Sequence, residues 1–543
     1  MIVVAFRRAR LVSAALFAGL VAALIAGLVS PRNARAQSAV PTLTYVYLRN
    51  TDTIGVETIT HTPTSVDGVL AMKGSPRIAW SQAHLNATPG ILTMQVYTPG
   101  SAADAAPVQH LTIEMRGDSA VIVFLGPTPR TQVFPSTAGA VPLINASVLH
   151  AALLASYARR TNASTLNLFL TAGAQTMSAT ISILGDTTRF QLATSDTRIL
   201  SAPDGMPSAI LIPSKNIRVI RVTGNAKAPS TAAMRMNYDA PAGAPYTAEH
   251  VRIATGRGYE LAATLTTPNG VSNGVKKSPV LITISGSGPQ ERDSRISLVE
   301  GYALFRQIAD TLGRRGIAVL RFDDRGVGES TGRESAATAT SADFADDVRS
   351  IVTWLRARAD IDGARIALAG HSEGGMIAPM VASTDKTIKG IALLAGPAYT
   401  GKRVSMYQNR QVLDGQPSLS PKQRDSILAT VPAKLDSAGE ATPWLGYWLT
   451  HDPVVVARTV TQPVLILQGL TDTQVSPEQA DTLAIAFRRG GNRHVTVRTF
   501  AATNHLFVPD VAGQFSGYTA LKDPKVRPAV LGALADWAVQ LFR

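Results

Sequence analysis

The stretch RIALAGHSEGGMIAPMVAS, residues 365–383, sets the architecture of this 543-residue chain. Its first apolar run predicts a buried strand, and the apolar run after Gly375 predicts a helix. Ser372 therefore lies on a tight strand-to-helix turn, where its neighbours must be small, as Gly370 and Gly374 are. A serine on such a turn presents its hydroxyl beside the N-terminus of the helix, where backbone amides stabilise negative charge. We therefore predict that Ser372 is a nucleophile.

A second Gly-x-Ser-x-Gly match, GVGESTG at residues 326–332, contains Ser330. The strand pattern AVLRF ends at Phe322, so the loop DDRGVG separates it from this serine. The residues that follow, TGRESAATATSA, contain no immediate apolar helix pattern. We interpret this segment as a structural loop whose match to the nucleophile pattern is coincidental.

From residue 246 to 543, apolar runs alternate with amphipathic helical patterns. In one of these helices Phe344, Val348, Ile351 and Leu355 form a single stripe. Continuous apolar strands that alternate with helices predict an α/β domain with a mostly parallel sheet covered on both faces. Residues about 400–458 contain no strand pattern, and we predict a helical cap insertion there, over the carboxyl ends of the strands.

The region before residue 246 has a different pattern. Residues 37–225 alternate apolar and polar positions between Gly, Pro, Asn and Asp turns, which predicts a separate β-rich accessory domain. One helix interrupts it, with Asn145 as the expected N-cap. Residues 226–245, rich in Ala, Pro and Gly, are the expected linker.

Residues 1–36 have the layout of a secretory signal peptide: Arg7, Arg8 and Arg10, then a long apolar run, then the small-residue site Ala34-Arg35-Ala36. Cleavage there predicts a secreted or periplasmic protein with no stable membrane span after signal removal. The alternative is an uncleaved N-terminal anchor, because the apolar run is long for a signal.

Charge and cysteine content exclude several classes of partner and chemistry. The net charge of +14 falls to +9 once the five arginines of residues 1–36 are subtracted, and the remaining basic residues are dispersed. A nucleic-acid binder would concentrate them in a stripe with aromatic residues, so we expect no nucleic-acid partner. The chain has no cysteine, which excludes disulfides, thiol nucleophiles and thiolate metal sites.

A serine nucleophile needs a histidine base and an acid that orients the histidine. In enzymes whose nucleophilic serine lies on such a strand-to-helix turn, the acid follows the serine in the chain and the histidine follows the acid. Of the histidines after Ser372, His505 lies in the loop after the last strand pattern, whereas His451 lies in the insertion and His494 at a strand start. Asp472 follows the strand VLILQG directly. We predict Asp472 and His505 as acid and base, and we interpret Asp452 and Asp481 as solvated.

The negative charge that develops on a substrate oxygen needs two backbone donors. The amide of Glu373, directly after the nucleophile, is one candidate. The amide of Ser287, in the loop after the strand PVLITIS, is the other. His371 is interpreted as a packed neighbour rather than a second base.

Three motifs together resemble a known family: GSGPQERD at residues 286–293, DRGVGES at 324–330 and GHSEGG at 370–375. Residues about 246–543 are similar to the α/β-hydrolase superfamily, in particular to bacterial serine esterases related to serine aminopeptidase-like hydrolases. The resemblance implies the α/β-hydrolase fold, a Ser-Asp-His triad and a recurring structural role for the second motif. It does not extend to the β-rich region.

The expected function is therefore an exported serine carboxylesterase that acts on a small-molecule ester through an acyl-enzyme, with no metal and no organic cofactor. A serine peptidase that uses the same triad is the first alternative, and thioester hydrolysis is another. A non-catalytic binding protein with a vestigial hydrolase domain is an alternative of a different class. The sequence does not indicate the substrate-binding residues, the acyl and alcohol specificity, or the oligomeric state.

Overall fold

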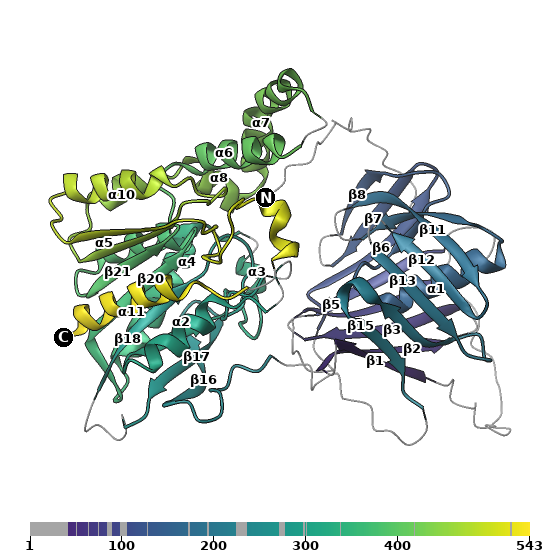
Figure 1. The fold of residues 1–543 in the computed structure, drawn as a ribbon, viewed down its shortest axis with the longest axis horizontal. Helices are drawn as coiled ribbons and strands as arrows, with labels where there is room; N and C mark the ends of the chain where they lie inside the picture. The colour runs from purple at the N-terminus through teal and green to yellow at the C-terminus, as the bar shows by residue number, and fades with distance from the viewer. Residues whose placement is uncertain are drawn as a thin grey trace, which may run out of the picture. The chain divides into compact units, whose positions relative to one another are not determined.

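The computed structural model describes residues 42–543 except 50–51, 63, 74, 84–89, 98–105, 127–128, 172–173, 193–194, 224–235, 271–276, 297–298, 300, 337, 417–418 and 522–523. The chain divides into two compact units with a boundary between Met234 and Arg235 (Figure 1). The predicted signal segment and residues 226–235 of the predicted linker lie outside the described residues.

A single sheet dominates the first unit, so the expectation of a β-rich region ahead of the α/β domain is confirmed. Its strands are β1 (Thr42–Arg49), β2 (Asp52–His61), β3 (Ser65–Met72), β4 (Arg77–Ala83), β5 (Leu92–Tyr97), β6 (Gln109–Arg116), β7 (Ser119–Leu125), β8 (Arg130–Pro135), β9 (Val141–Leu143), β10 (Thr165–Leu170), β11 (Gln175–Leu184), β12 (Thr187–Leu192), β13 (Ser195–Ser201), β14 (Pro207–Ile212) and β15 (Ile217–Arg221).

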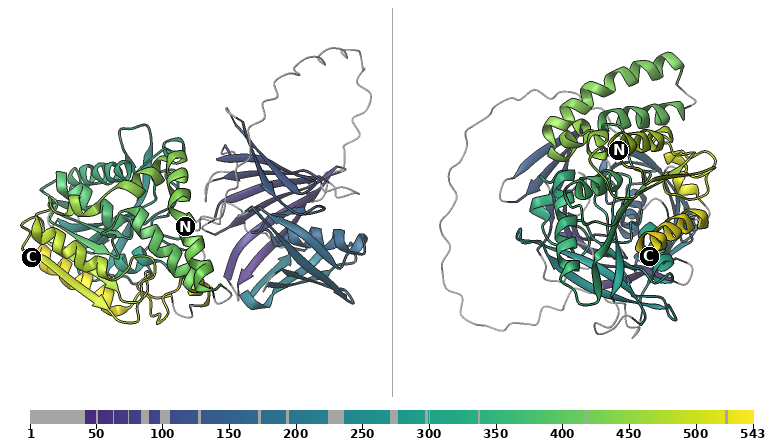
Figure 2. Two further views of the ribbon diagram at one scale, coloured as in Figure 1. Left: turned by 90° about the horizontal axis from the view of Figure 1, so that it is seen from above. Right: turned by 90° about the vertical axis from the view of Figure 1, so that its left-hand side faces the viewer.

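The sheet consists of two meanders, which are joined where its first strand, β1, pairs with its last strand, β15. Strands β1 to β8 are neighbours in chain order, and so are β9 to β15. The two runs meet where β1 pairs antiparallel with β15, with Val46 opposite Ile220. Each neighbouring pair is antiparallel except β9 with β10. Figure 2 shows the strands of this unit in two further views.

Helix α1 (Val148–Arg160) supplies the centre of this unit's core. Leu149 and Leu154 pack in one cluster with strand residues of both meanders, such as Tyr45 and Phe190. The two meanders therefore share one core around the helix. The N-cap is Ser147, whose hydroxyl accepts from the amide of His150, and not Asn145 as expected. Ser147 is favoured because its hydroxyl also donates to the buried carboxylate of Glu57 at 2.6 Å.

The second unit is built on an eight-stranded sheet in the order β16-β17-β19-β18-β20-β21-β22-β23. Its strands are β16 (Tyr246–Ala254), β17 (Glu260–Pro268), β18 (Ser278–Ile284), β19 (Ala318–Phe322), β20 (Ile361–His371), β21 (Gly390–Leu394), β22 (Val464–Gly469) and β23 (Val495–Phe500). The hairpin β16–β17 enters antiparallel, and all pairs from β19 onward are parallel. Their carboxyl ends therefore meet at one edge, where ligands bind in open α/β sheets.

Helices cover both faces of this sheet, as the alternation of patterns predicts. The helices of this unit outside the predicted insertion are α2 (Leu304–Gly313), α3 (Arg333–Ala336), α4 (Ser341–Arg356), α5 (Gly374–Thr384), α10 (Glu478–Arg489) and α11 (Pro528–Phe542). The α4 stripe of Val348, Ile351 and Leu355 is fully buried in the core cluster on one face. Helices α2 and α11 pack together on the other face.

The predicted insertion forms four helices, α6 (Gly401–Asp414), α7 (Pro421–Ala441), α8 (Pro443–Thr450) and α9 (Pro453–Ala457). Helices α6, α7 and α8, which we call the cap, pack in an apolar cluster that also includes Met376 of α5. No helix among the described residues is long and apolar enough to cross a membrane. In the same part of the chain, no group of three or more His, Asp or Glu side chains is placed to hold a metal ion.

Candidate active site

Ser372 lies on a strained turn between β20 and α5. Its φ is +54°, a backbone conformation that L-residues rarely adopt. A Cβ on Gly370 would overlap the carbonyl of Gly374, and one on Gly374 would overlap that of Ile284. The turn is therefore possible only with glycine at both positions. The serine side chain is half-buried, so it remains within reach of a ligand.

Ser330 occupies a different environment. It is 5% exposed, its hydroxyl donates to the carbonyl of Asp323 at 2.8 Å, and it accepts from the amide of Ala262 at 2.9 Å. These two bonds join the loop after β19 to strand β17. Because both hydrogen bonds of the Ser330 hydroxyl are made with backbone groups, this serine has a structural role.

Asp472 and His505 are adjacent, although 33 residues separate them in sequence. His505 Nδ1 lies 2.8 Å from Asp472 Oδ2, and both residues are buried. The carboxylate also accepts from the amides of Gln474 and Val475 at 2.8 and 2.9 Å and from Gln468 Nε2 at 3.1 Å. These donors hold the charged carboxylate in place, and Nδ1–H of His505 donates to it, which leaves Nε2 free to act as a base.

Close packing of two loops brings this acid and base together. A Cβ on Gly469, at the end of β22, would overlap the carbonyl of Thr503 in the loop after β23. His371 Nε2 lies 3.0 Å from the carbonyl oxygen of His505, and the two rings are 4.8 Å apart. Burial lowers the pKa of His371 to about 3, so its neutral ring donates from Nε2 and fixes the His505 backbone beside the Ser372 turn. This is the packed neighbour that the sequence indicates.

Within the described residues, the Ser372 hydroxyl makes no hydrogen bond to His505. Catalytic hydrogen bonds are often long in the absence of substrate and tighten when it binds. The other acids and histidines lie elsewhere: Asp452 caps α9, Asp481 is exposed on α10, and His451 stacks on Tyr447.

The predicted oxyanion donors lie on two loops that touch at the nucleophile. A Cβ on Gly286 would come within 3.0 Å of the Ser372 Cβ, which places the loop after β18 against the serine. Among the described residues, neither the amide of Ser287 nor that of Glu373 has a hydrogen-bond acceptor. Both amides are therefore available to a ligand.

A buried ion-pair network, which the sequence analysis did not predict, connects the loop after β18 with the loop after β19. Arg292, which is 0% exposed, donates to both carboxylate oxygens of Asp323, at 3.0 and 2.8 Å, and to Glu329 at 2.9 Å. Tyr238 covers the guanidinium, whose carbon lies 4.2 Å from the ring centre. The network joins the motifs at 286–293 and 324–330 through the bond from Arg292 to Glu329. The available signal was the presence of Arg and acidic residues in both loops.

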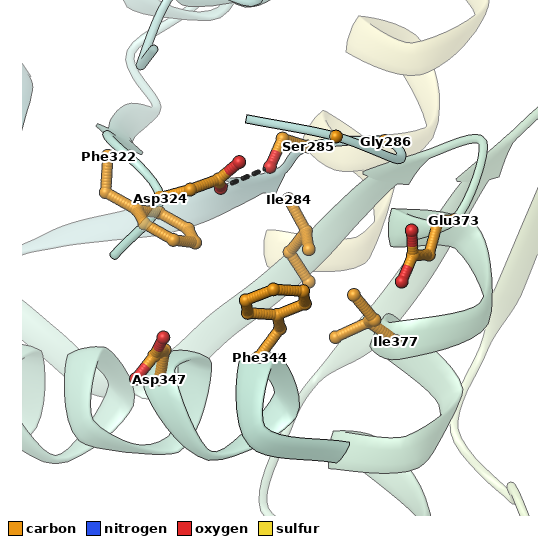
Figure 3. Close-up of a pocket in the computed structure, with 10 residues that line it drawn as sticks. Ile284, Ser285, Gly286, Phe322, Asp324, Phe344, Asp347, Glu373 and Ile377 are labelled. Atoms are coloured by element: carbon orange, nitrogen blue, oxygen red, sulfur yellow. Dashed lines mark hydrogen bonds between the residues drawn. The ribbon is translucent and has the colours of Figure 1, made fainter. Parts of the chain in front are cut away.

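Three carboxyl groups, those of Asp324, Asp347 and Glu373, line a small hollow beside these loops (Figure 3). Asp324 accepts from the Ser285 hydroxyl at 2.5 Å and from the Gln290 amide at 2.9 Å. Burial raises its pKa to about 8. Glu373 lies on the other side of the hollow, and burial raises the pKa of its carboxyl while hydrogen bonds from Ser341, Trp444 and Ser287 lower it.

The sheet order, the strained serine turn and the acid–histidine pair after β22 and β23 define an α/β hydrolase. Residues 246–543 have the α/β-hydrolase fold. Within it, residues 297–462 match the family model of serine aminopeptidase, S33.

Among proteins of known sequence, the chain is 24% identical to esterase EstD of Thermotoga maritima over 267 residues, or 48% of this chain. The match spans 62% of the length of that esterase, less than two thirds. An uncharacterised protein of Mycobacterium tuberculosis is 36% identical over 100 residues, 18% of this chain and 32% of that protein.

Solved structures also resemble the chain. The Pyrococcus furiosus esterase Pf2001 is 16% identical with a TM-score of 0.38, covering 57% of this chain and 96% of that one. Est1E of Butyrivibrio proteoclasticus, solved with ferulic acid, is 18% identical with a TM-score of 0.35, covering 54% and 98%.

Proposed function

We propose that residues 246–543 hydrolyse carboxylic esters of small molecules through an acyl-enzyme on Ser372. One observation carries the proposal: a serine held at φ +54° lies at the same sheet edge as a buried histidine whose Nδ1 is 2.8 Å from an aspartate. A hydroxyl becomes an effective nucleophile when such a pair accepts its proton.

In the proposed reaction, His505 Nε2 takes the proton from Ser372 Oγ as this oxygen attacks the acyl carbon. Asp472 keeps Nδ1 protonated and stabilises the imidazolium that forms. The amides of Ser287 and Glu373 stabilise the oxyanion. His505 then protonates the leaving alcohol, and a water molecule, activated by the same histidine, releases the acid from Ser372. The mechanism requires no metal or organic cofactor.

The two serines provide a matched test with p-nitrophenyl esters. Ser372→Ala should lower kcat by roughly 10⁶-fold and abolish labelling by a fluorophosphonate probe. Ser330→Ala should keep most of kcat, because its hydroxyl bonds only to backbone groups, but should destabilise the fold by about 1–3 kcal/mol through the unsatisfied Ala262 amide. Loss of turnover on replacing Ser330 but not Ser372 would contradict the assignment.

An amide-cleaving enzyme is the second candidate, favoured by the match of residues 297–462 to the serine aminopeptidase model. The same triad serves both reactions, because only the leaving group differs. A panel of p-nitrophenyl esters and aminoacyl p-nitroanilides distinguishes them. We expect kcat/KM to be higher for esters, and higher values for the anilides would reverse the order.

We also propose that the protein is exported and acts in the periplasm or outside the cell. The arginines, apolar run and small-residue site of residues 1–36 support this. The mass of the purified mature protein tests it, since cleavage after Ala36 removes this segment. A full-length chain found at the membrane would favour the anchored alternative.

A further inference from the structure

Two cap residues donate hydrogen bonds to two of the three loops that carry the predicted triad, the turn of Ser372 and the loop of Asp472. Trp444, on α8, donates from Nε1 to Glu373 Oε1 at 2.9 Å. Tyr407, on α6, donates from its hydroxyl to the carbonyl oxygen of Asp472 at 3.1 Å. Glu373 directly follows Ser372, so the cap contacts the nucleophile turn and the acid loop at the same time.

The Glu373 carboxyl depends on the first of these contacts. It is 1% exposed, and its Oε1 also accepts from the Ser341 hydroxyl, at the start of α4, at 2.6 Å. A buried carboxyl needs such donors, because an unsatisfied one is costly. Helix α8 cannot move away without leaving this group short of a donor. The backbone amide of the same residue is a predicted oxyanion donor, so a shift of Glu373 displaces that amide.

The cap itself is one packed body attached to the helix behind the nucleophile. Its apolar cluster includes Val404 of α6, Leu435 of α7 and Trp448 of α8, together with Met376 of α5. A Cβ on Gly401, at the start of α6, would overlap Trp448, so α6 and α8 approach closely. Because α6 and α8 are packed together, a movement of one helix would disturb both the Tyr407 contact and the Trp444 contact.

We propose that Tyr407 and Trp444 are positioning residues, through which the cap holds the nucleophile turn and the acid loop at a fixed separation. The inference rests on the proposed function. It makes the cap part of the catalytic scaffold, in contrast to a lid that only covers the substrate. Small displacements of reacting groups lower the rate of the chemical step, so loosening either loop reduces kcat for every ester.

A lid and a scaffold differ in which kinetic constant responds. Removing contacts from a lid weakens binding of esters with long acyl chains, which raises KM and leaves short esters unaffected. Removing contacts from a scaffold lowers kcat for short and long esters alike. The pair p-nitrophenyl acetate and p-nitrophenyl octanoate therefore separates the two roles.

The experiment uses the full mature chain with Trp444→Phe, Tyr407→Phe and both changes together. For both esters we expect kcat to fall about tenfold or more in Trp444→Phe, which loses a bond to a carboxylate, and about threefold in Tyr407→Phe, with KM within about twofold. In Tyr407→Phe the acid limb of the kcat/KM profile against pH should also move, because Asp472 orients the base.

Matched controls change the same residue types away from these contacts. Trp537→Phe, in α11, removes an indole of similar half-burial, and Tyr447→Phe removes a hydroxyl from α8 itself. Both should keep kcat and KM at the wild-type values. A loss of kcat in either control equal to that of Trp444→Phe would overturn the inference.

Glu373 provides a second test that does not rely on the tryptophan. Glu373→Gln keeps an oxygen that accepts from Trp444 and Ser341, so we expect it to retain more kcat than Glu373→Ala, by about tenfold. Equal losses in these two variants, or changes confined to KM for the octanoate, would show that the cap does not position the loops. A wild-type protein that neither turns over esters nor reacts with a fluorophosphonate would instead refute the proposed function.

Discussion

Single residues at the site show which features local sequence determines. Ser372 was predictable because its glycines and flanking apolar runs are contiguous, and the structure places it at φ +54°. Asp472 and His505 were predictable from the order of strands, and they lie 2.8 Å apart. The surroundings of Asp324 were not predictable, because the groups that donate to its carboxyl, Ser285 and Gln290, come from another loop. Groups that directly follow a recognisable strand are therefore visible in the sequence, whereas the hydrogen-bond partners of Asp324 are not.

Asp324 makes the stability of the protein depend on pH. Its folded pKa of about 8 lies above the ordinary value of 3.8, so between these values the native state holds a proton that the unfolded chain has released. Its contribution to stability is complete below pH 3.8 and is lost as pH rises through about 8. Asp324→Asn cannot ionise, so we expect its free energy of unfolding to decline less than that of the wild type from pH 5 to 9. Denaturant titrations at several pH values measure this, and parallel curves would contradict it.

Among the secondary-structure elements, the helices of the second unit form where the sequence has amphipathic patterns, because their apolar stripes face a sheet. Helix α4 begins at Ser341 and buries the predicted stripe. The predicted N-cap of α1, Asn145, was wrong. The N-cap is Ser147, which is favoured because its hydroxyl donates to Glu57, 90 residues away in the sequence. The order of strands in the first sheet was not predictable, because alternation defines a strand but not its neighbour.

Glu57 fixes α1 against the sheet. Its buried carboxyl accepts from Trp80 Nε1 at 3.0 Å, from Ser147, and from the hydroxyl of Tyr47. Glu57→Ala leaves these donors unsatisfied, and we expect it to destabilise the first unit by about 3 kcal/mol. Hydrogen exchange should show lost protection in peptides of β1–β15 and unchanged protection in β16–β23. Glu114→Ala, which removes only an exposed ion pair with Arg116, is the control and should change neither.

At the scale of the whole molecule, each unit has a core of its own among the described residues. The cluster around α1 draws only on residues of the first unit, and the clusters on the two faces of the second sheet draw only on the second. A unit with its own core can fold alone. The second unit includes Tyr238, buried against Arg292, within the segment that composition marks as linker. The composition of this segment predicted a linker between the two units, but it did not show that Tyr238 would pack on Arg292.

We expect a fragment of residues 236–543 to fold and to keep the ester turnover of the full chain. A fragment of residues 246–543 lacks the ring that covers the buried Arg292 guanidinium and should be less stable by about 1–2 kcal/mol. Thermal unfolding and p-nitrophenyl ester assays of both fragments test this. Equal melting temperatures would show that Tyr238 contributes nothing, and an inactive longer fragment would show that the first unit is needed for turnover.

The pairing of β1 with β15 determines when the first unit can be completed. The polypeptide leaves the ribosome from its amino end, so one side of β1 has no partner until Arg221, which lies opposite Tyr45, has been synthesised. Until then the chain carries an exposed edge with free amides and carbonyls, which other chains can pair with. Assembly of this unit is therefore slow compared with synthesis of its first hairpins, and a chain interrupted before residue 217 is prone to aggregate.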